Sequence, residues 1–135
     1  MIRSSKKTRQ RRRMVKDLDA EARNAVFGRD GHKCVRCGRA SRIQWAHIIS
    51  RRHLCTRWET DNAITLCAGC HMFWHSYPSL SGPWFAKNWP ERHEHILALY
   101  NAGGKVNVKQ VHEEMLADPP AVKLMSPIRD EDIPF

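Results

Sequence analysis

The sequence predicts a small α+β domain with flanking helices and disordered termini, and three observations carry that prediction. First, two Cys-x-x-Cys pairs, Cys34/Cys37 and Cys67/Cys70, lie near the middle of the chain. Second, short β-rich and helical segments alternate around those pairs. Third, the first 16 of the 135 residues carry eight basic side chains and no acid, and the chain from Asp118 onward is rich in Pro and acid. Residues 17–117 are therefore expected to form one domain, small enough for a structural metal ion to matter.

Local signals place each element in order along the chain. Asp17 suits the N-cap of a helix that Gly28 or Gly31 ends. Runs of β-branched and aromatic residues favour strands, and Pro78 ends the helix before it. The predicted elements are a helix over 17–27, strands over 43–49 and 63–66, and helices over 69–77, 90–101 and 108–116. Residues 50–61 are expected to form a basic loop, and residues 78–89 a turn.

The four paired cysteines predict a structural zinc site. Four thiolates give Zn²⁺ a complete tetrahedral shell with no open position. In a reducing compartment, cysteine pairs of this spacing are more often metal ligands than disulfides. Use of the pairs as a thiol redox centre is disfavoured, because two pairs converge more naturally on one ion. Cys55, the fifth cysteine, is expected to be a buried or half-buried thiol outside the site.

The residues between and after the cysteine pairs resemble the HNH endonucleases of the ββα-metal fold. The resemblance rests on Ala46-His47-Ile48, then Asp61-Asn62, then Leu66-Cys-x-x-Cys-His71-x-x-x-His75. The resemblance covers about residues 28–77. Within the family, this segment is similar to the zinc-bound branch, particularly to small phage-encoded members that include the NinG/Rap-type recombination nucleases. The resemblance implies a ββα-metal core and metal-dependent DNA cleavage that leaves 3′-hydroxyl and 5′-phosphate ends.

Phosphodiester hydrolysis requires catalytic groups that the histidines in this segment could supply. The reaction needs a base to activate water and a cation to neutralise charge on the phosphate and the leaving oxygen. His47 is the expected base, because a neutral imidazole accepts a proton near pH 7. His71 and His75 fall one helical turn apart and would hold the catalytic metal. The resemblance implies that Asn62 braces the loop and orients His47.

One position departs from the pattern. HNH enzymes commonly carry Asp or His just before the base, where it binds the metal, but this chain has Ala46. Two imidazoles alone make a weak site, and Mg²⁺ prefers oxygen ligands. The substrate phosphate and waters could complete the shell, His53 could supply a ligand from the loop, or Mn²⁺, Ni²⁺ or Zn²⁺ could replace Mg²⁺. The alternative that this protein has only weak catalytic activity also stays open.

The charge pattern points to nucleic acid as a partner. The formal net charge is +9 and the isoelectric point about 9.8, and such a field attracts polyanions. Residues 1–16 hold eight basic side chains and no acid, so they are expected to form a disordered basic arm. The predicted DNA contacts are the arm's Arg11, Arg12 and Arg13 and the loop's Arg51, Arg52 and Arg57, which would bind phosphates.

The last residues predict a second partner. Residues 118–135 form an acidic, proline-containing tail that ends in Asp132-Ile133-Pro134-Phe135. This end resembles the acidic tip of bacterial single-stranded-DNA-binding proteins, which docks genome-maintenance proteins. A terminal Phe beside a carboxylate, with acids before it, suits a peptide that docks on a basic rim. The alternative is a plain acidic tail that folds back on the basic arm.

Together these features predict a metal-dependent HNH endonuclease that cleaves or nicks DNA in phage recombination or replication. The alternative is a non-catalytic, zinc-stabilised DNA-binding adaptor that recruits host repair proteins through its tip. Zn²⁺ is the expected structural cofactor, and Mg²⁺ or another divalent ion the catalytic one. No apolar run reaches the roughly 18 residues of a membrane span, and no secretory signal is visible. The expected location is the host cytoplasm, near the nucleoid. The DNA structure preferred and the oligomeric state stay open.

Overall fold

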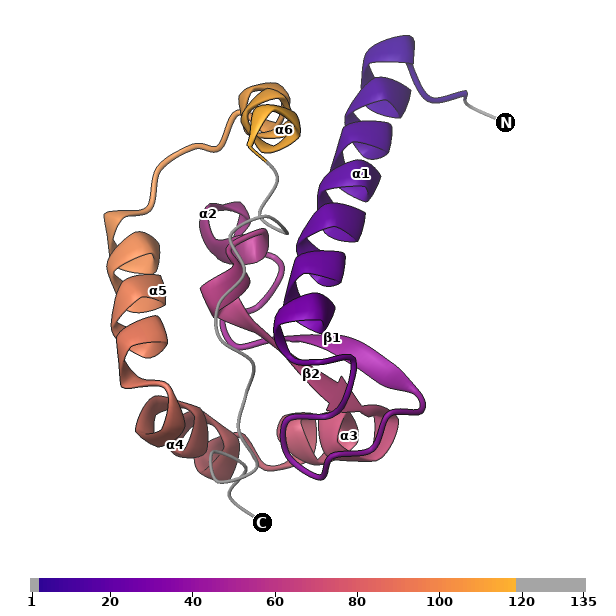
Figure 1. Cartoon of the computed structure of the whole chain (residues 1–135). Coiled ribbons are helices and arrows are strands. Elements are labelled where there is room, and N and C mark those ends of the chain that lie inside the picture. Colours follow the sequence, from indigo (N-terminus) through magenta and orange to yellow (C-terminus); the bar gives the residue numbers. More distant parts are fainter. Residues whose placement is uncertain (1–2, 119–135) are drawn as a thin grey trace.

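A long N-terminal helix and a two-stranded antiparallel sheet form the centre of the fold, in a computed structural model that describes residues 3–118 (Figure 1). The domain is mixed α+β and mostly helical. Its elements are α1 (Lys6–Arg29), β1 (Ile43–His47), α2 (Leu54–Arg57), the 3₁₀ turn η1 (Thr60–Asn62), β2 (Ala63–Cys67), α3 (Ala68–Ser76), α4 (Pro78–Asn88), α5 (Pro90–Ala102) and α6 (Val108–Ala117). The predicted docking residues Asp132, Ile133, Pro134 and Phe135 lie outside the described part of the chain.

Helix α1 begins much earlier than the sequence signals indicate. Its N-cap is Ser5, whose Oγ accepts a hydrogen bond from the Thr8 amide at 3.2 Å, rather than Asp17. The prediction of a disordered arm over residues 1–16 was therefore wrong for residues 6–16. The middle of the helix packs against α6, and strong helix formers such as Lys, Arg and Gln then extend it toward the N-terminus at little cost.

The two strands pair antiparallel, with Ile43 opposite Cys67 and His47 opposite Ala63. Every residue of β2 is buried, whereas β1 has exposed, half-buried and buried positions. The strand predicted to reach residue 49 ends at His47, because Asn62 takes over the pairing. The Ile48 amide donates to the Asn62 carbonyl at 2.9 Å, and the Ile49 amide donates to Asn62 Oδ1 at 2.8 Å.

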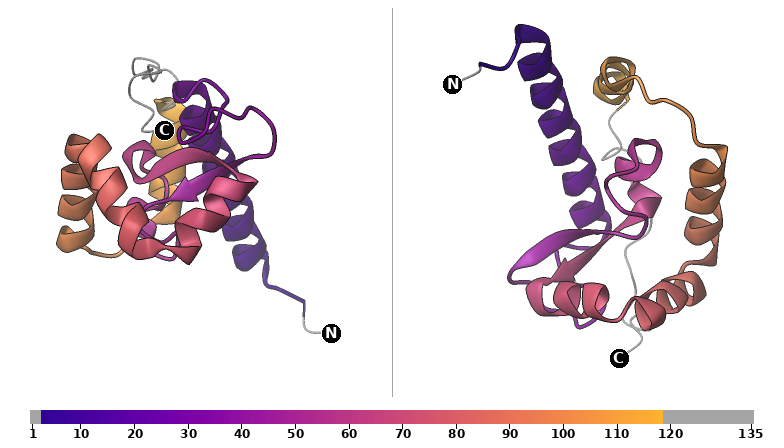
Figure 2. Two further views of the ribbon diagram at one scale, coloured as in Figure 1. Left: turned by 90° about the horizontal axis from the view of Figure 1, so that it is seen from below. Right: turned by 180° about the vertical axis from the view of Figure 1, so that it is seen from behind.

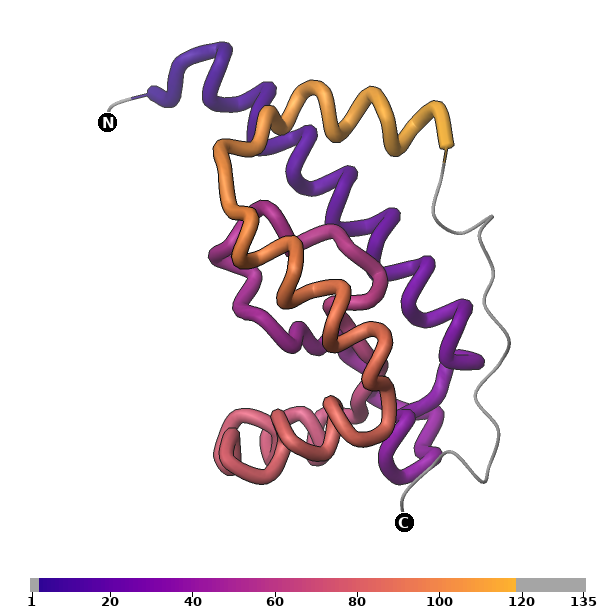
Figure 3. The backbone as a smooth tube through the Cα atoms, turned by 90° about the vertical axis from the view of Figure 1, so that its left-hand side faces the viewer, coloured from indigo at the N-terminus to yellow at the C-terminus, as the bar shows by residue number. Residues whose placement is uncertain are grey.

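The core has two parts. In one, α3, α4 and α5 pack beneath the sheet around buried apolar side chains that include Ile64, Leu66, Phe85 and Ile96. In the other, α6 packs on α1 through Leu18, Ala22, Trp58 and Val108. In the right-hand view of Figure 2, α3 lies below the sheet, α1 and α6 lie above it and α5 stands to one side, and Figure 3 shows α6 next to α1.

Helix α4 occupies the segment that was predicted to be a turn. Gly82 and Pro83 favour a turn locally, and Pro83 lies inside the helix. Tertiary contacts outweigh that preference: Phe85 is fully buried, and the Ser81 hydroxyl donates to the Trp74 carbonyl at 3.1 Å. Pro78, at the first turn of α4, has no amide hydrogen that the helix would need there.

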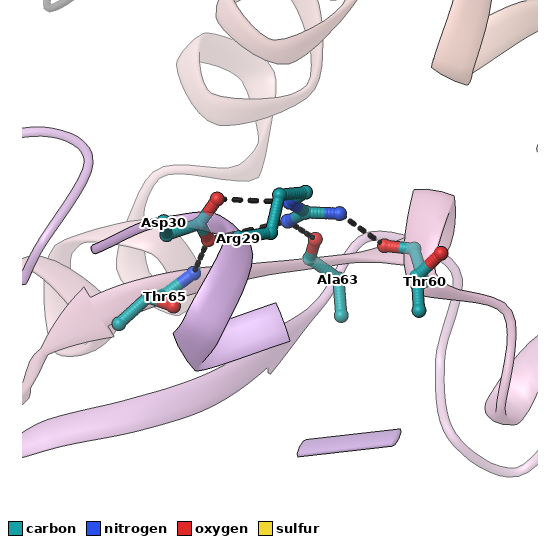
Figure 4. A network of polar contacts seen from close by, with 5 residues as sticks. All are labelled: Arg29, Asp30, Thr60, Ala63 and Thr65. Carbon is teal, nitrogen blue, oxygen red and sulfur yellow. Dashed lines mark hydrogen bonds and ion pairs between the residues drawn. The ribbon is translucent and has the colours of Figure 1, made fainter. Parts of the chain in front are cut away.

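A buried ion pair joins the end of α1 to β2 (Figure 4). Arg29 Nε lies 2.9 Å from Asp30 Oδ1, and the Arg29 guanidinium also donates to the carbonyls of Thr60 and Ala63, each at 2.7 Å. Asp30 Oδ2 accepts from the Thr65 amide at 2.9 Å. These bonds satisfy charges that would otherwise be costly to bury. The bonds join the end of α1, which precedes the first cysteine pair, to β2, which leads into the second pair.

Candidate metal centre and histidine cavity

The four paired cysteines lie together. Their sulfur atoms are all within 4.8 Å of one another, and Cys37 Sγ lies 3.6 Å from Cys67 Sγ. That spacing is far beyond the roughly 2.05 Å of a disulfide. Tetrahedral Zn–S bonds of about 2.3 Å imply sulfur atoms about 3.8 Å apart. The donor set and its spacing therefore fit a structural metal ion such as zinc.

Backbone geometry brings the two pairs to one point. The Gly38 amide donates to the Cys34 carbonyl at 2.9 Å, and Gly38 adopts a φ of +80°, which only glycine takes without strain. Cys67 ends β2 and caps α3, because its sulfur accepts from the Cys70 amide at 3.5 Å. The Val35 amide donates to the Thr65 carbonyl at 2.9 Å, which ties the first turn to β2.

The thiols influence one another's protonation. Burial alone raises the pKa of Cys67, but hydrogen bonds from the Cys70 amide and from neighbouring thiols lower that pKa to about 7. Burial and the neighbouring sulfurs raise the pKa of Cys70 well above its usual range. The Arg36 guanidinium lies 3.7 Å from the Cys70 sulfur. In this cluster one thiol loses its proton easily and a neighbouring one does not. A bound divalent cation would stabilise the thiolates and so favour deprotonation of all four.

His71 and His75 face each other on α3. Their Nε2 atoms are 3.0 Å apart, and two imidazole nitrogens bound to one ion at 2.0–2.1 Å would be roughly 2.9–3.4 Å apart. His71 Nδ1 donates to Gln44 Oε1 at 2.6 Å, which leaves the lone pair of His71 on Nε2. Burial, followed by the nearby His75, lowers the pKa of His71 and favours the neutral form that binds metal.

His47 is the last residue of β1, and a hydrogen bond to the backbone determines its tautomer. Its Nε2 lies 3.0 Å from the Arg57 carbonyl oxygen, which can only accept, so Nε2 carries the proton and Nδ1 the lone pair. Burial lowers the pKa of His47 to about 4, and the charges of Arg51 and Arg57 add to that effect. Near pH 7 the imidazole is therefore neutral, with a free lone pair on Nδ1, although the same burial makes it a weaker base.

Asn62 is fully buried and closes the loop that follows β1. Its Nδ2 donates to the carbonyls of Ile49 and Thr56, at 3.0 and 3.1 Å, while its Oδ1 accepts from the Ile49 amide. The same loop presents the Arg57 carbonyl to His47. Asn62 thus holds this loop together, and among the described residues its side-chain hydrogen bonds go to Ile49 and Thr56 and not to His47.

One cavity of about 530 Å³ receives the three histidines. Its lining includes His47, Trp45 and Ile48 from β1 and its end, His71, Trp74 and His75 from α3, Ser50 and Arg51 from the loop, and Pro78, Ser81 and Gly82 from α4. Helix α4, which the local sequence did not predict, thus forms part of the wall. The predicted catalytic and metal-binding histidines therefore line one cavity.

The three loop arginines have different surroundings. Arg51 lines the histidine cavity, whereas Arg52 is exposed and lines another cavity with His53. Arg57 forms a two-pronged ion pair with Asp19 of α1, at 2.9 and 2.7 Å. Its side chain therefore ties the loop to α1, and the phosphate contact expected of Arg57 stays a prediction.

Asp19 is a structural residue that no local sequence pattern marks. Burial alone raises its pKa, but hydrogen bonds from Arg57 and Trp58 and the charge of Arg57 hold the pKa below the usual value. The Trp58 indole nitrogen donates to Asp19 Oδ1 at 2.9 Å. Partners 38 and 39 residues apart in the chain carry no local signal.

Ala46 and His53 narrow the ways in which the metal shell could be completed. Ala46 is fully buried in the core, on the strand face opposite to that of His47. The His53 ring packs edge-on against Tyr100, with centroids 5.0 Å apart, and does not line the histidine cavity. Gln44 shares the strand face of Ala46 and orients His71 through a hydrogen bond. No local sequence pattern predicts this contact, because the two residues are far apart in the chain.

Comparison of the chain with family models, with curated proteins and with solved structures gives no match. The likeness to HNH enzymes therefore remains a resemblance of motifs. No helix within residues 3–118 has the length and apolar character that crossing a membrane requires.

Proposed function

We propose that this protein is a metal-dependent endonuclease that hydrolyses DNA phosphodiester bonds. The observation that carries the proposal is that His47, His71 and His75 line one cavity beside the cysteine cluster. The order of these residues in the chain resembles that of HNH nucleases. Arg51, at the same cavity, adds a positive charge where a phosphate would lie.

The chain's own residues would divide the work. His47 Nδ1 would take a proton from the water that attacks phosphorus, while the bond from phosphorus to the 3′ oxygen breaks. His71 Nε2 and His75 Nε2 would hold the divalent ion, with Gln44 keeping His71 in the correct tautomer. A bound ion would neutralise charge on the phosphate and the leaving oxygen. Asn62 would keep the loop, and so His47, in place.

The donor set bears on the choice of ion. Two imidazoles suit Mn²⁺, Ni²⁺ or Zn²⁺ better than Mg²⁺, which prefers oxygen. With Ala46 in the core and His53 packed on Tyr100, phosphate oxygens and water are the remaining ligands available. We therefore expect the softer ions to support activity at lower concentrations than Mg²⁺.

A second function has one observation in its favour. Ala46 removes the ligand that HNH enzymes commonly carry before the base, and its burial leaves no room for a replacement there. A non-catalytic, zinc-stabilised DNA-binding adaptor would need no such ligand. In that case the tip formed by Asp132, Ile133, Pro134 and Phe135 would supply the useful activity, by recruiting genome-maintenance proteins.

Cleavage assays distinguish the two functions. Supercoiled and branched DNA would be incubated with zinc-loaded protein and added Mg²⁺, Mn²⁺, Ni²⁺ or Zn²⁺, alongside His47→Ala and the control His95→Ala. His95 lies on α5, where it pairs with Asp61, and does not line the cavity. We expect His47→Ala to lose about 10²–10⁴-fold in rate and His95→Ala to retain activity. Absence of cleavage with every ion, or equal cleavage by His47→Ala, would favour the adaptor.

A further inference from the structure

The first half of α1 is basic on all sides. Residues 3–16 carry eight Lys and Arg side chains and no acid. Residues 6–13 are all exposed. Within residues 3–118 none of these eight side chains forms a salt bridge; Arg9 and Arg12 each donate a hydrogen bond to Ser4. Over residues 6–13 the helix is polar on every face and carries charge of one sign, which suits it to a polyanion.

This basic half projects from the domain as a helical rod. Figures 1 and 2 show the N-terminal turns of α1 extending beyond the rest of the fold. The rod is held at its base, because Met14, Val15, Leu18 and Ala22 pack in the cluster that α6 covers. At 1.5 Å per residue, residues 6–16 span about 16 Å, or roughly five base pairs of DNA.

The charge changes sign where the helix meets the domain. The first acids of α1, Asp17 and Asp19, are already engaged: Asp17 lies 3.2 Å from His112 of α6, and Asp19 is paired with Arg57. The basic surface therefore ends at Lys16, and the acids beyond it serve the fold. This division separates a binding segment, residues 6–16, from a structural segment, residues 17–29.

We propose that residues 6–16 of α1 bind double-stranded DNA by lying in its major groove. This inference rests on the proposed function for DNA as the substrate, and it adds the form of DNA and a binding site apart from the histidine cavity. An α-helix about 10–12 Å wide fits a groove about 12 Å wide. Side chains on all faces of the helix then reach phosphates on both strands.

The composition of the rod disfavours other polyanionic partners. Residues 3–26 contain no aromatic side chain, so the rod offers no platform on which single-stranded bases could stack. The major groove of double-stranded RNA is too narrow for a helix. Residues 3–13 contain no apolar side chain to anchor a helix in a membrane surface. Duplex DNA is the partner that charge and shape together favour.

The first test removes charge and keeps the helix. Arg11, Arg12 and Arg13 would be replaced together by Gln, which has a similar helix propensity. The control replaces the exposed Arg23, Arg39 and Arg42 by Gln, which removes the same net charge elsewhere. Binding to a short DNA duplex would be measured on zinc-loaded full-length protein, without added divalent ions, over a range of salt. We expect the first variant to lose at least about tenfold in affinity and its salt slope to fall by about 2–3. The control variant should keep most of the affinity and most of the salt slope.

The second test breaks the rod and keeps every charge. In Gln10→Pro the ring clashes with the carbonyl of Lys6 and removes a helical hydrogen bond, so the first turn unwinds. We expect Gln10→Pro to bind duplex DNA several-fold more weakly than the control Gln10→Ala. Equal binding by the two variants would overturn groove binding in favour of a flexible polycation. Equal or tighter binding to single-stranded DNA or double-stranded RNA would overturn the choice of duplex DNA.

These readouts are independent of the nuclease chemistry. His47→Ala is expected to bind duplex DNA normally and to cleave it about 10²–10⁴-fold more slowly. The triple Arg→Gln variant is expected to cleave at a normal rate once duplex DNA is saturating. If the protein binds duplex DNA through α1 and never cleaves it, the proposed function fails and the inference about α1 stands. If the triple variant cleaves normally at saturation but shows no loss of affinity, the inference fails and the function stands.

Discussion

The cysteine cluster and the histidine pair are two metal-binding arrangements that share one short helix and differ in almost every other respect. The cluster brings four donors within 4.8 Å of one another, and the residues Cys34, Cys67 and Cys70 are buried. The histidine pair offers two donors beside a cavity of about 530 Å³. Cys70 and His71 are neighbours in α3, yet Cys70 is buried among the sulfurs and His71 faces the cavity. Consecutive helical residues point about 100° apart, which makes this separation possible.

The contrast teaches what each arrangement is suited to do. A complete tetrahedral shell has no position for substrate, so its metal contributes to folding. An incomplete shell beside a cavity leaves positions for phosphate and water. Loss of the cluster should therefore affect the whole fold, and loss of the histidine pair should affect chemistry alone.

The largest effect is expected from Cys67→Ser. Cys67 supplies a ligand and also caps α3, so its loss should release zinc and abolish the cooperative thermal transition. Cys55→Ser, which alters a half-buried thiol outside the cluster, is the control and should keep both. Zinc content and thermal denaturation measure the outcome. An unchanged zinc content in Cys67→Ser would remove the basis for calling the cluster a structural site.

His71→Ala should separate the two arrangements most sharply. We expect its affinity for Mn²⁺ or Ni²⁺ at the second site to fall at least about tenfold and cleavage to fall with it. Its zinc content and melting temperature should stay near those of the parent protein, because the side chain is outside the core clusters. Calorimetric titration and thermal denaturation check the two parts. A large drop in melting temperature would mean that the histidine pair is structural too.

Asn62→Ala should have an intermediate effect on stability. Removing the side chain breaks three hydrogen bonds within the loop and leaves buried backbone groups unpaired. A loss of about 2–4 kcal/mol in the free energy of unfolding follows, with reduced cleavage because His47 loses its support. Urea denaturation measures the loss. Asn88→Ala, which breaks one bond to the Trp84 carbonyl, is the control and should cost clearly less.

The last effect concerns pH. The pKa of His47 is about 4 when folded, below its value of about 6.5 when unfolded. The unfolded chain therefore binds more protons between those values, so His47 lowers stability as pH falls from about 6.5 to about 4. Urea denaturation across this range should show a steeper loss for the parent protein than for His47→Ala. Identical pH dependence would mean that His47 titrates normally and is not buried as described.

Secondary structure was predictable where local chemistry and tertiary packing agree. Both strands and the helices α3, α5 and α6 lie within a few residues of their expected bounds. Predictions failed where packing outweighed local signals: α1 continues through a run of like charges, and α4 contains Pro83. In both, buried contacts elsewhere in the element stabilise a conformation that the local sequence alone does not favour.

The sequence by itself determined the donors: four cysteines in two pairs, and histidines at a helical spacing. Ligand identity and short-range spacing are written in the chain, since both depend on neighbouring residues. Tertiary structure alone decided which groups support those donors. It brought Gln44 to His71, Asp19 to Arg57 and the Arg29–Asp30 pair to β2, and it turned Ala46 into the core. Such contacts join residues far apart in the chain, where no local pattern reports them.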